Sequence, residues 1–295
     1  MKFAMLFPGQ SSQNFYIVKK LYKNYSIIRK TFSRSSNYLG YNLWKKLKKK
    51  KKKKNSNYFN QIEIFTISIS IYKLWKSYFH FHPDIMSGHS LGQYSALVCS
   101  KSIDFLDALK IISYRKKIMK KKIGRMYAII GLKKKIIKKI CKKYPKKNPV
   151  SIACINSKNQ IVITGNKKNS KKASLKCKLN GAKYIIKLPI KTISHCPSMK
   201  YIKKKLFHKI KKIKFYKPKN LIIDSSTLQC TNNSFKIKNL LIDQLCKTIQ
   251  WKKTVDLIIS KKIKYFLEIS SENNLTKLNK KNKNYIPLSI KKIFC

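Results

Sequence analysis

The sequence is short of acidic residues and of arginine. It has 9 Asp and Glu against 70 Lys and Arg, and only four of these basic residues are arginine, which gives a formal charge of +61 at pH 7. Proteins that bind nucleic acids usually depend on the bidentate and stacking contacts of arginine. Here lysine accompanies abundant Ile, Asn, Tyr and Phe, whose codons are rich in A and T. We therefore interpret the charge as a compositional bias of the surface.

Two further absences narrow the class of protein. The eight cysteines lie far apart with no Cys-x-x-Cys pair, which argues against a disulfide scaffold or a zinc site and favours a reduced, cytoplasmic setting. No apolar run reaches the roughly 18 residues that span a bilayer, and residues 1–7 are too short for a secretory signal. Because 43% of the residues are hydrophobic and 12% aromatic, a sizeable core is expected and wholesale disorder is excluded.

Hydrophobic periodicity predicts a body in which strands and helices alternate. A short buried strand at residues 3–7 ends at Pro8, and a second strand at 85–87 is followed at once by a glycine-containing turn. The lysine-rich run at residues 45–54 is expected to be a solvated loop insertion. The other elements expected in this body are helices at 12–38, 61–78, 92–99 and 105–121 and strands near 221–224 and 265–269.

The middle of the chain has a different rhythm. Strands and helices are expected in the order β-α-β-β-α-β between residues 126 and 188, which is the order of a ferredoxin-like unit. We therefore predict an α/β protein in which residues 1–123 and 190–295 form a core with a parallel sheet. Residues 124–189 are predicted to form an inserted ferredoxin-like subdomain.

The sharpest local signal is the pattern Gly88-x-Ser90-x-Gly92 between an expected strand and an expected helix. In a nucleophile elbow the chain turns so tightly that the residues two before and two after the serine must be small. The turn places the hydroxyl near a helix N-terminus, where backbone N–H groups and the helix dipole stabilise an oxyanion. With eight glycines in the chain, the chance expectation of the pattern is roughly 0.02. A plain strand-helix turn is the alternative interpretation.

A nucleophilic serine needs a base, and the chain has five histidines. His89 belongs to the turn itself and is expected to point away from the serine hydroxyl. His80 and His82 lie in an apparent loop, and His208 lies in a lysine-rich helix. His195 follows the predicted subdomain in a loop, where functional residues concentrate. His195 is therefore the preferred base, with a surface histidine as the alternative.

Several motifs, in order along nearly the whole chain, resemble the malonyl-CoA–acyl carrier protein transacylase family. They are Phe7-Pro8-Gly9-Gln10-Ser11-Ser12-Gln13, Gly88-His89-Ser90-Leu91-Gly92-Gln93-Tyr94-Ser95-Ala96, Tyr114-Arg115-Lys116, Ile129-Ile130-Gly131-Leu132, Ser194-His195-Cys196 and Gln250-Trp251. The resemblance implies an α/β-hydrolase-like core with a ferredoxin-like insertion. It also implies malonyl-CoA and acyl carrier protein as partners. No metal, cofactor, membrane or specific nucleic acid is expected, and we expect a monomer.

The resemblance implies a ping-pong transfer that supplies fatty-acid chain elongation. Ser90, deprotonated by His195, would attack the malonyl thioester and release coenzyme A, and the phosphopantetheine thiol of the carrier would then take malonyl from the serine. Backbone N–H groups of Gln10 and Leu91 would form the oxyanion hole. A carbonyl oxygen of Gln250 would hold the His195 ring in place of the acid of a usual triad, in a chain with no acid at an evident triad position.

Arg115 would pair with the malonyl carboxylate. A planar guanidinium holds a carboxylate through two parallel hydrogen bonds, which lysine cannot do. An arginine at this motif position is informative because only four of the 70 basic residues are arginine. A surface arginine is the alternative interpretation, and Arg125 at the subdomain edge is expected to be structural.

The chain departs from the family pattern at three places. The family usually has Gly where this chain has Ser11, Glu where it has Gln93, and Gly-Pro-Gly where it has residues 270–272. Ser11 could perturb the loop beside the oxyanion hole if that position needs a positive φ. Gln93 removes a charge from the first turn of the elbow helix, at a cost of about 0.3–1 kcal/mol. None of these positions is an expected catalytic residue, so we predict an active enzyme.

Other functions stay open at this point. A serine hydrolase, or an acyltransferase for another acyl group, would use the same elbow. A basic nucleic-acid-binding protein would use the lysine-rich surface, although that surface would equally help to dock an acidic carrier protein. A decayed relative would keep the fold without a useful rate.

Overall fold

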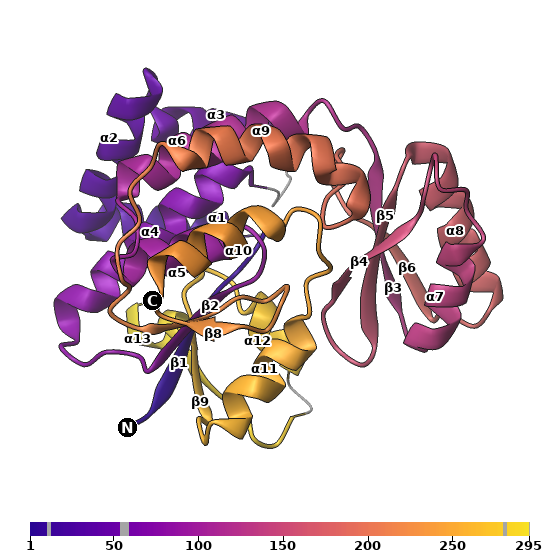
Figure 1. Cartoon of the computed structure of the whole chain (residues 1–295). Coiled ribbons are helices and arrows are strands. Elements are labelled where there is room, and N and C mark those ends of the chain that lie inside the picture. The colour runs from indigo at the N-terminus through magenta and orange to yellow at the C-terminus, as the bar shows by residue number, and fades with distance from the viewer. Residues whose placement is uncertain (11–12, 54–58, 280–281, 295) are drawn as a thin grey trace.

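A computed structural model describes the chain except for residues 11–12, 54–58, 280–281 and 295. Two β-sheets organise it, one of six strands and one of four (Figure 1). The smaller sheet and its two helices stand at one end of the molecule, on the right in Figure 1, and the other helices surround the larger sheet. The protein is therefore of mixed α/β class, with a sheet that is mostly parallel.

The larger sheet has the order β10-β9-β1-β2-β7-β8, and all its neighbouring strands are parallel except β7 and β8. In the central strand β1 (Phe3–Phe7), Phe3 and Met5 belong to one core cluster, whereas Ala4 and Leu6 belong to another. This alternation means that apolar side chains cover both faces of the sheet. The other strands are β2 (Ile85–Gly88), β7 (Leu221–Ile223), β8 (Cys230–Thr231), β9 (Tyr265–Glu268) and β10 (Ile286–Ser289).

Helix α4 (Gln61–Tyr78) is largely buried among the helices that pack on this sheet. It begins with a capping box, in which the Asn60 side chain accepts from the Glu63 backbone and the Glu63 carboxylate accepts from the Asn60 backbone.

Among the described residues, no helix has the length and apolar character to cross a bilayer. The other helices of this body are α1 (Phe15–Asn24), α2 (Ser26–Leu39), α3 (Leu43–Lys53), α5 (Gly92–Cys99), α6 (Phe105–Met119), the 3₁₀ helix η1 (Pro197–Met199), α9 (Lys200–Lys211), α10 (Ser234–Asp243), α11 (Trp251–Ser260), α12 (Asn274–Asn279) and α13 (Ile290–Phe294).

The smaller sheet is antiparallel and has the order β4-β5-β3-β6. One of its faces packs on both helices of the unit, and Ile129 lies in that core. On the other face, Ala128 and Val162 join a core cluster of the larger body, so this face looks toward the larger sheet. The elements of the unit are β3 (Arg125–Ile130), α7 (Lys134–Lys142), β4 (Ser151–Ile155), β5 (Gln160–Gly165), α8 (Lys167–Leu179) and β6 (Tyr184–Lys187).

Strand β4 also bonds to the segment that precedes α11. The Ile155 N–H donates to the Ile249 carbonyl at 2.8 Å, and the Ile249 N–H donates to the Ala153 carbonyl at 2.9 Å. The Thr248 hydroxyl donates to the Ile152 carbonyl at 2.7 Å. These backbone bonds hold the smaller sheet against the larger body next to the segment that carries Gln250.

The lysine-rich run does not form the loop that the sequence analysis predicted. Up to Lys53 it is the C-terminal part of α3, and Lys54 lies outside the described residues. Leu43 and Leu47, one helical turn apart, are both buried and anchor the helix. Lys50 forms an ion pair with Glu63 at 2.9 Å. Lysine also has good helix propensity. This propensity, the burial of two leucines and the ion pair together outweigh the repulsion between neighbouring lysine charges.

Candidate active site

Strand β2 and helix α5 meet at Ser90 in the sharp turn that the sequence pattern predicted. Ser90 has φ 55°, in the left-handed region that few non-glycine residues adopt. A Cβ added at Gly88 would lie 2.0 Å from the backbone nitrogen of Gln93, and one added at Gly92 would lie 2.1 Å from the Phe7 carbonyl oxygen. No real side chain tolerates such approaches, so this turn requires both glycines.

His195 lies beside Ser90, as the sequence analysis expected. Its Nε2 is 2.7 Å from the Ser90 Oγ, although the two residues are 105 positions apart in the chain. His195 comes from the loop between β6 and η1, has φ 58° and is 3% exposed. A serine hydroxyl hydrogen-bonded to an imidazole is the arrangement that nucleophilic catalysis needs.

The other nitrogen of the His195 ring contacts a different residue from the one predicted. Nδ1 lies 2.8 Å from the backbone oxygen of Gln244, so the expectation for Gln250 is wrong. The Gln250 carbonyl instead accepts hydrogen bonds from Thr254 in the first turn of α11. Gln244 directly follows α10, and carbonyls at a helix C-terminus lack intrahelical partners. Because a carbonyl can only accept, it keeps the proton on Nδ1 and leaves Nε2 as the acceptor.

Burial lowers the pKa of His195 to about 3. The hydrogen bond to the Gln244 carbonyl opposes this shift, and the nearby Arg115 and His89 add to it. The imidazole is therefore neutral at neutral pH, which is the form that can accept a proton from Ser90.

The low pKa of His195 predicts a pH-dependent stability. An unfolded histidine has a pKa of about 6.5, so below that pH the unfolded chain binds a proton that folded His195 refuses. The contribution of His195 to the free energy of unfolding is complete above pH 6.5 and is lost progressively as the pH decreases toward 3. We expect the wild type to lose about 2 kcal/mol more than His195→Gln between pH 7.5 and pH 5 in urea unfolding. The exposed His208→Gln variant is the control and should follow the wild type, whereas equal losses in all three proteins would contradict the assignment.

Arg115 of α6 is a buried cation, 3% exposed. Its Nη1 donates to the Gln61 Oε1 at 2.6 Å, and the Gln61 Nε2 donates in turn to the Gln10 Oε1 at 3.4 Å. Burial lowers the pKa of Arg115. The ion pairs found among the described residues do not include Arg115. An anionic ligand would therefore supply a charge partner that the part of the chain described by the structure does not provide.

Ser90, His195 and Arg115 line one cavity of about 700 Å³. Gln10, which follows β1, and Leu91, which follows the nucleophile, line it as well, so both predicted oxyanion-hole residues border the same space. The smaller sheet, the segment that follows β6, the end of α6 and α12 contribute apolar walls, and these side chains include Met119, Met126, Ala128, Val162, Leu188, Ile190, Leu275 and Leu278. The cavity thus combines a nucleophile, a base and a fixed positive charge with apolar walls.

The structure gives Gln93 a specific role. Its Oε1 accepts a hydrogen bond from the Gly88 N–H at 2.9 Å, and its Nε2 donates to the Ile223 carbonyl at 3.4 Å. An ionised glutamate could make only the first of these bonds. The side-chain amide therefore joins the elbow to β7, and this contact offsets the loss of a charge at the start of α5.

The serines at the third departure also make specific contacts. The Ser271 hydroxyl donates to the Gln13 Oε1 at 2.8 Å, and the Ser271 hydroxyl accepts from the Asn14 backbone at 3.1 Å. These bonds connect the loop after β9 to the residues that precede α1. Ser11 lies outside the described residues.

Two residues of the site escaped the sequence analysis. Gln61 is the first residue of α4, directly after the capping residue Asn60, and its side chain is buried. The only signal in the sequence is a polar residue at the start of a long apolar segment. Gln244 acts through its backbone carbonyl, for which the side chain gives no signal.

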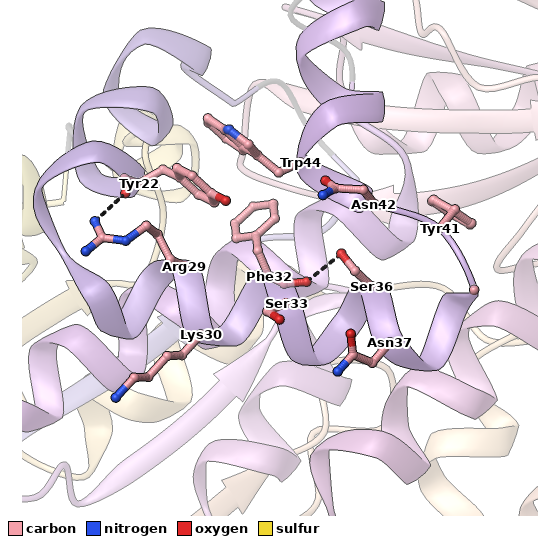
Figure 2. Close-up of a pocket in the computed structure, with 11 residues that line it drawn as sticks. Tyr22, Arg29, Lys30, Phe32, Ser33, Ser36, Asn37, Tyr41, Asn42 and Trp44 are labelled. Atoms are coloured by element: carbon pink, nitrogen blue, oxygen red, sulfur yellow. Dashed lines mark hydrogen bonds between the residues drawn. The ribbon is translucent and has the colours of Figure 1, made fainter.

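A second cavity, of about 630 Å³, lies between α1, α2 and the start of α3 (Figure 2). Arg29 points toward Tyr22 there, and its Nη1 donates to the carbonyls of Tyr22 and Lys23 at 3.1 and 2.7 Å. Tyr22 also stacks on Trp44 with ring centroids 3.8 Å apart. Arg29 therefore satisfies carbonyls at the end of α1 and has a structural role.

The chain is similar to known acyltransferases over most of its length. Residues 4–284 match the model of the acyl transferase domain. A malonyl CoA-acyl carrier protein transacylase of Buchnera aphidicola subsp. Schizaphis graminum is 44% identical over 97% of this chain and 94% of its own length. The chain belongs to the malonyl CoA-acyl carrier protein transacylase family. It is thus a member of a family of acyltransferase enzymes.

Solved structures of other transacylases resemble this chain over nearly its whole length. The malonyl CoA-acyl carrier protein transacylase of Coxiella burnetii has a TM-score of 0.89 and 30% identity, covering 98% of this chain and 94% of its own. A malonyl-transacylase in complex with its type II PKS acyl-carrier protein has a TM-score of 0.88 and 32% identity, covering 98% of this chain and 95% of its own. The mixed α/β fold is therefore that of the transacylases.

Proposed function

We propose that this transacylase moves the malonyl group from malonyl-CoA to the phosphopantetheine thiol of acyl carrier protein, for fatty-acid synthesis. One observation carries the proposal: a serine paired with a neutral histidine at 2.7 Å and a buried arginine line the same cavity. The pair supplies nucleophile and base, and the arginine selects an acyl group that ends in a carboxylate. The names of the related transacylases support the same donor and acceptor.

In the first half-reaction the Ser90 Oγ attacks the thioester carbonyl while His195 Nε2 takes its proton. The carbonyl oxygen becomes an oxyanion, which the backbone N–H groups of Gln10 and Leu91 would receive. The C–S bond then breaks, and the leaving thiolate of coenzyme A takes the proton back from His195. Malonyl is left as an ester on Ser90, with its carboxylate against Arg115.

In the second half-reaction the roles of the thiols are reversed. His195 takes the proton of the carrier's thiol, and the sulfur attacks the Ser90 ester through the same oxyanion geometry. Breaking the ester C–O bond returns the proton from His195 to Ser90. The Gln244 carbonyl, 2.8 Å from Nδ1, supports the imidazolium in both halves, where a triad would place a carboxylate.

We further assign the two sheets to two subdomains. Residues 1–123 and 190–295 would form an α/β-hydrolase-like core, which the strand-turn-helix geometry at Ser90 supports. Residues 124–189 would form a ferredoxin-like subdomain, which the β-α-β-β-α-β order and the sheet order β4-β5-β3-β6 support. Under this assignment the apolar wall of the acyl cavity comes partly from the inserted unit.

The chemical setting is part of the same proposal. The cysteines that the structure describes are free thiols, which supports a reducing, cytoplasmic compartment. The lysine-rich surface would attract an acidic carrier protein and raise its association rate. We propose that a monomer suffices, because the residues assigned to the reaction all come from one chain.

The test is the intact mass of the protein after brief mixing with malonyl-CoA or acetyl-CoA, with Ser90→Ala as the control. We expect a malonyl adduct on the wild type alone, which acyl carrier protein then removes. An adduct that water removes as fast as the carrier does would identify a hydrolase. Equal adducts from both thioesters would remove Arg115 as the selector, and no adduct on a folded wild type would overturn the proposed function.

A further inference from the structure

His89 is a second histidine of the site, and the reaction described above does not use it. It directly precedes Ser90, lines the same cavity and has its ring centroid 5.4 Å from that of Trp251. Burial lowers its pKa, so the ring is neutral at neutral pH. A neutral imidazole has one N–H donor and one acceptor nitrogen, and the contacts of the ring decide which is which.

The ring connects the elbow to the smaller sheet. His89 Nε2 lies 2.9 Å from the Asn156 Oδ1, and the Asn156 Nδ2 donates to the Gln160 Oε1 at 3.3 Å. In this arrangement the Asn156 oxygen faces the ring and its Nδ2 faces Gln160, so Nε2 carries the proton and donates. Asn156 follows β4 and Gln160 begins β5, and both line the cavity. The bond therefore holds one cavity wall in place against the elbow.

The other side of His89 meets the loop that carries Gln10. A Cβ added at Gly9 would lie 2.8 Å from the His89 Nδ1 and 2.7 Å from its carbonyl oxygen, so the Gly9 backbone rests against this residue. The backbone N–H of His89 also donates to the Phe7 carbonyl at 2.9 Å. His89 is thus in contact with the nucleophile's turn, the oxyanion loop and the smaller sheet.

We infer that His89 is a positioning residue for the transfer: by donating from Nε2 to Asn156, it fixes the Gly9-Gln10 loop and the β4–β5 wall around Ser90. This inference rests on the proposed function. The ring does not touch the reacting atoms. Its effect comes from geometry, because oxyanion donors and reacting groups lose their advantage when they are displaced by about 1 Å.

A matched pair of substitutions tests the donor. Gln and Met have similar length and volume, but only His89→Gln keeps an N–H that can reach Asn156. We expect His89→Met to lower kcat for transfer from malonyl-CoA to acyl carrier protein about 10-fold, with KM changed much less, and His89→Gln to recover most of that loss. Rates are expressed per reactive serine, counted by malonyl adduct. His208→Met, on an exposed face of α9, is the control and should match the wild type.

A double-mutant cycle isolates the bond. Asn156→Ala should lower kcat on its own but add little to His89→Met, because both remove the same interaction. If the wild type transfers malonyl and His89→Met keeps its kcat, or if the Gln variant is no better than the Met variant, the inference is overturned. A merely structural role would lower the melting temperature of both variants and leave kcat per reactive serine unchanged. A wild type that transfers nothing would overturn the proposed function instead.

Discussion

Replacing His195 with alanine is expected to lower the rate of Ser90 acylation about 10⁴-fold. The hydroxyl of a free serine is a weak nucleophile, and His195 Nε2, 2.7 Å from Oγ, is the base assigned to it. The pKa of about 3 keeps the base unprotonated throughout the neutral range, so the loss should be the same at pH 6 and pH 8. The measurement is the rate of malonyl adduct formation in single-turnover mixing.

Adding imidazole tests whether the loss of rate comes from the missing ring itself. Removing the ring leaves a space beside Ser90 and beside the Gln244 carbonyl, where a free imidazole can bind and accept the serine proton. We expect imidazole to restore part of the rate in His195→Ala and none in Ser90→Ala. His208→Ala on α9 should keep the wild-type rate. A His195→Ala protein that acylates within tenfold of the wild type would show that another group is the base.

The sequence was sufficient to predict most of the elements and their order. The expected helices at 61–78 and 92–99 coincide with α4 and α5, and the order β-α-β-β-α-β expected between residues 126 and 188 is the order observed from β3 to β6. Helix α4 is a long, mostly apolar segment and α5 begins at Gly92 directly after the elbow, so local composition and tertiary packing agree in these segments. The lysine-rich run was assigned wrongly because its charge dominates the composition. Two leucines, Leu43 and Leu47, decide the outcome through burial that composition alone does not reveal.

The chemistry of the site was predictable to the extent that side chains carry it. Ser90 and His195 were identified as candidates by their residue type and their position in the sequence, and the structure brings them together. The partner of the His195 ring was not predictable, because any residue can offer a backbone carbonyl. Gln244 and Gln250 lie six positions apart, and only the end of α10 determines which carbonyl faces the ring. Contacts that depend on the meeting of distant loops, such as that of His89 with Asn156, are invisible for the same reason.

Arg115→Met is expected to separate activity from stability. The guanidinium is buried and is held by a neutral partner, the Gln61 amide, at 2.6 Å. Without substrate its charge is desolvated and forms no ion pair with the residues that the structure describes, whereas a bound malonyl carboxylate would compensate it. Met fills a similar volume without charge. We therefore expect the variant to lose about 100-fold or more in kcat/KM for malonyl-CoA while its free energy of unfolding rises by about 1–3 kcal/mol.

Acetyl-CoA and a second arginine provide the controls. Acetyl has no carboxylate, so its slow transfer should be unchanged or faster in Arg115→Met, and the preference for malonyl should disappear. Arg125, whose Nη1 donates to the Gly124 carbonyl at 3.2 Å, is only partly buried, and Arg125→Met should alter neither preference nor rate. If Arg115→Met unfolds more easily than the wild type, the arginine serves the fold. Higher stability together with lost malonyl selectivity would mean that the protein retains an unfavourable buried charge because the substrate carboxylate needs it.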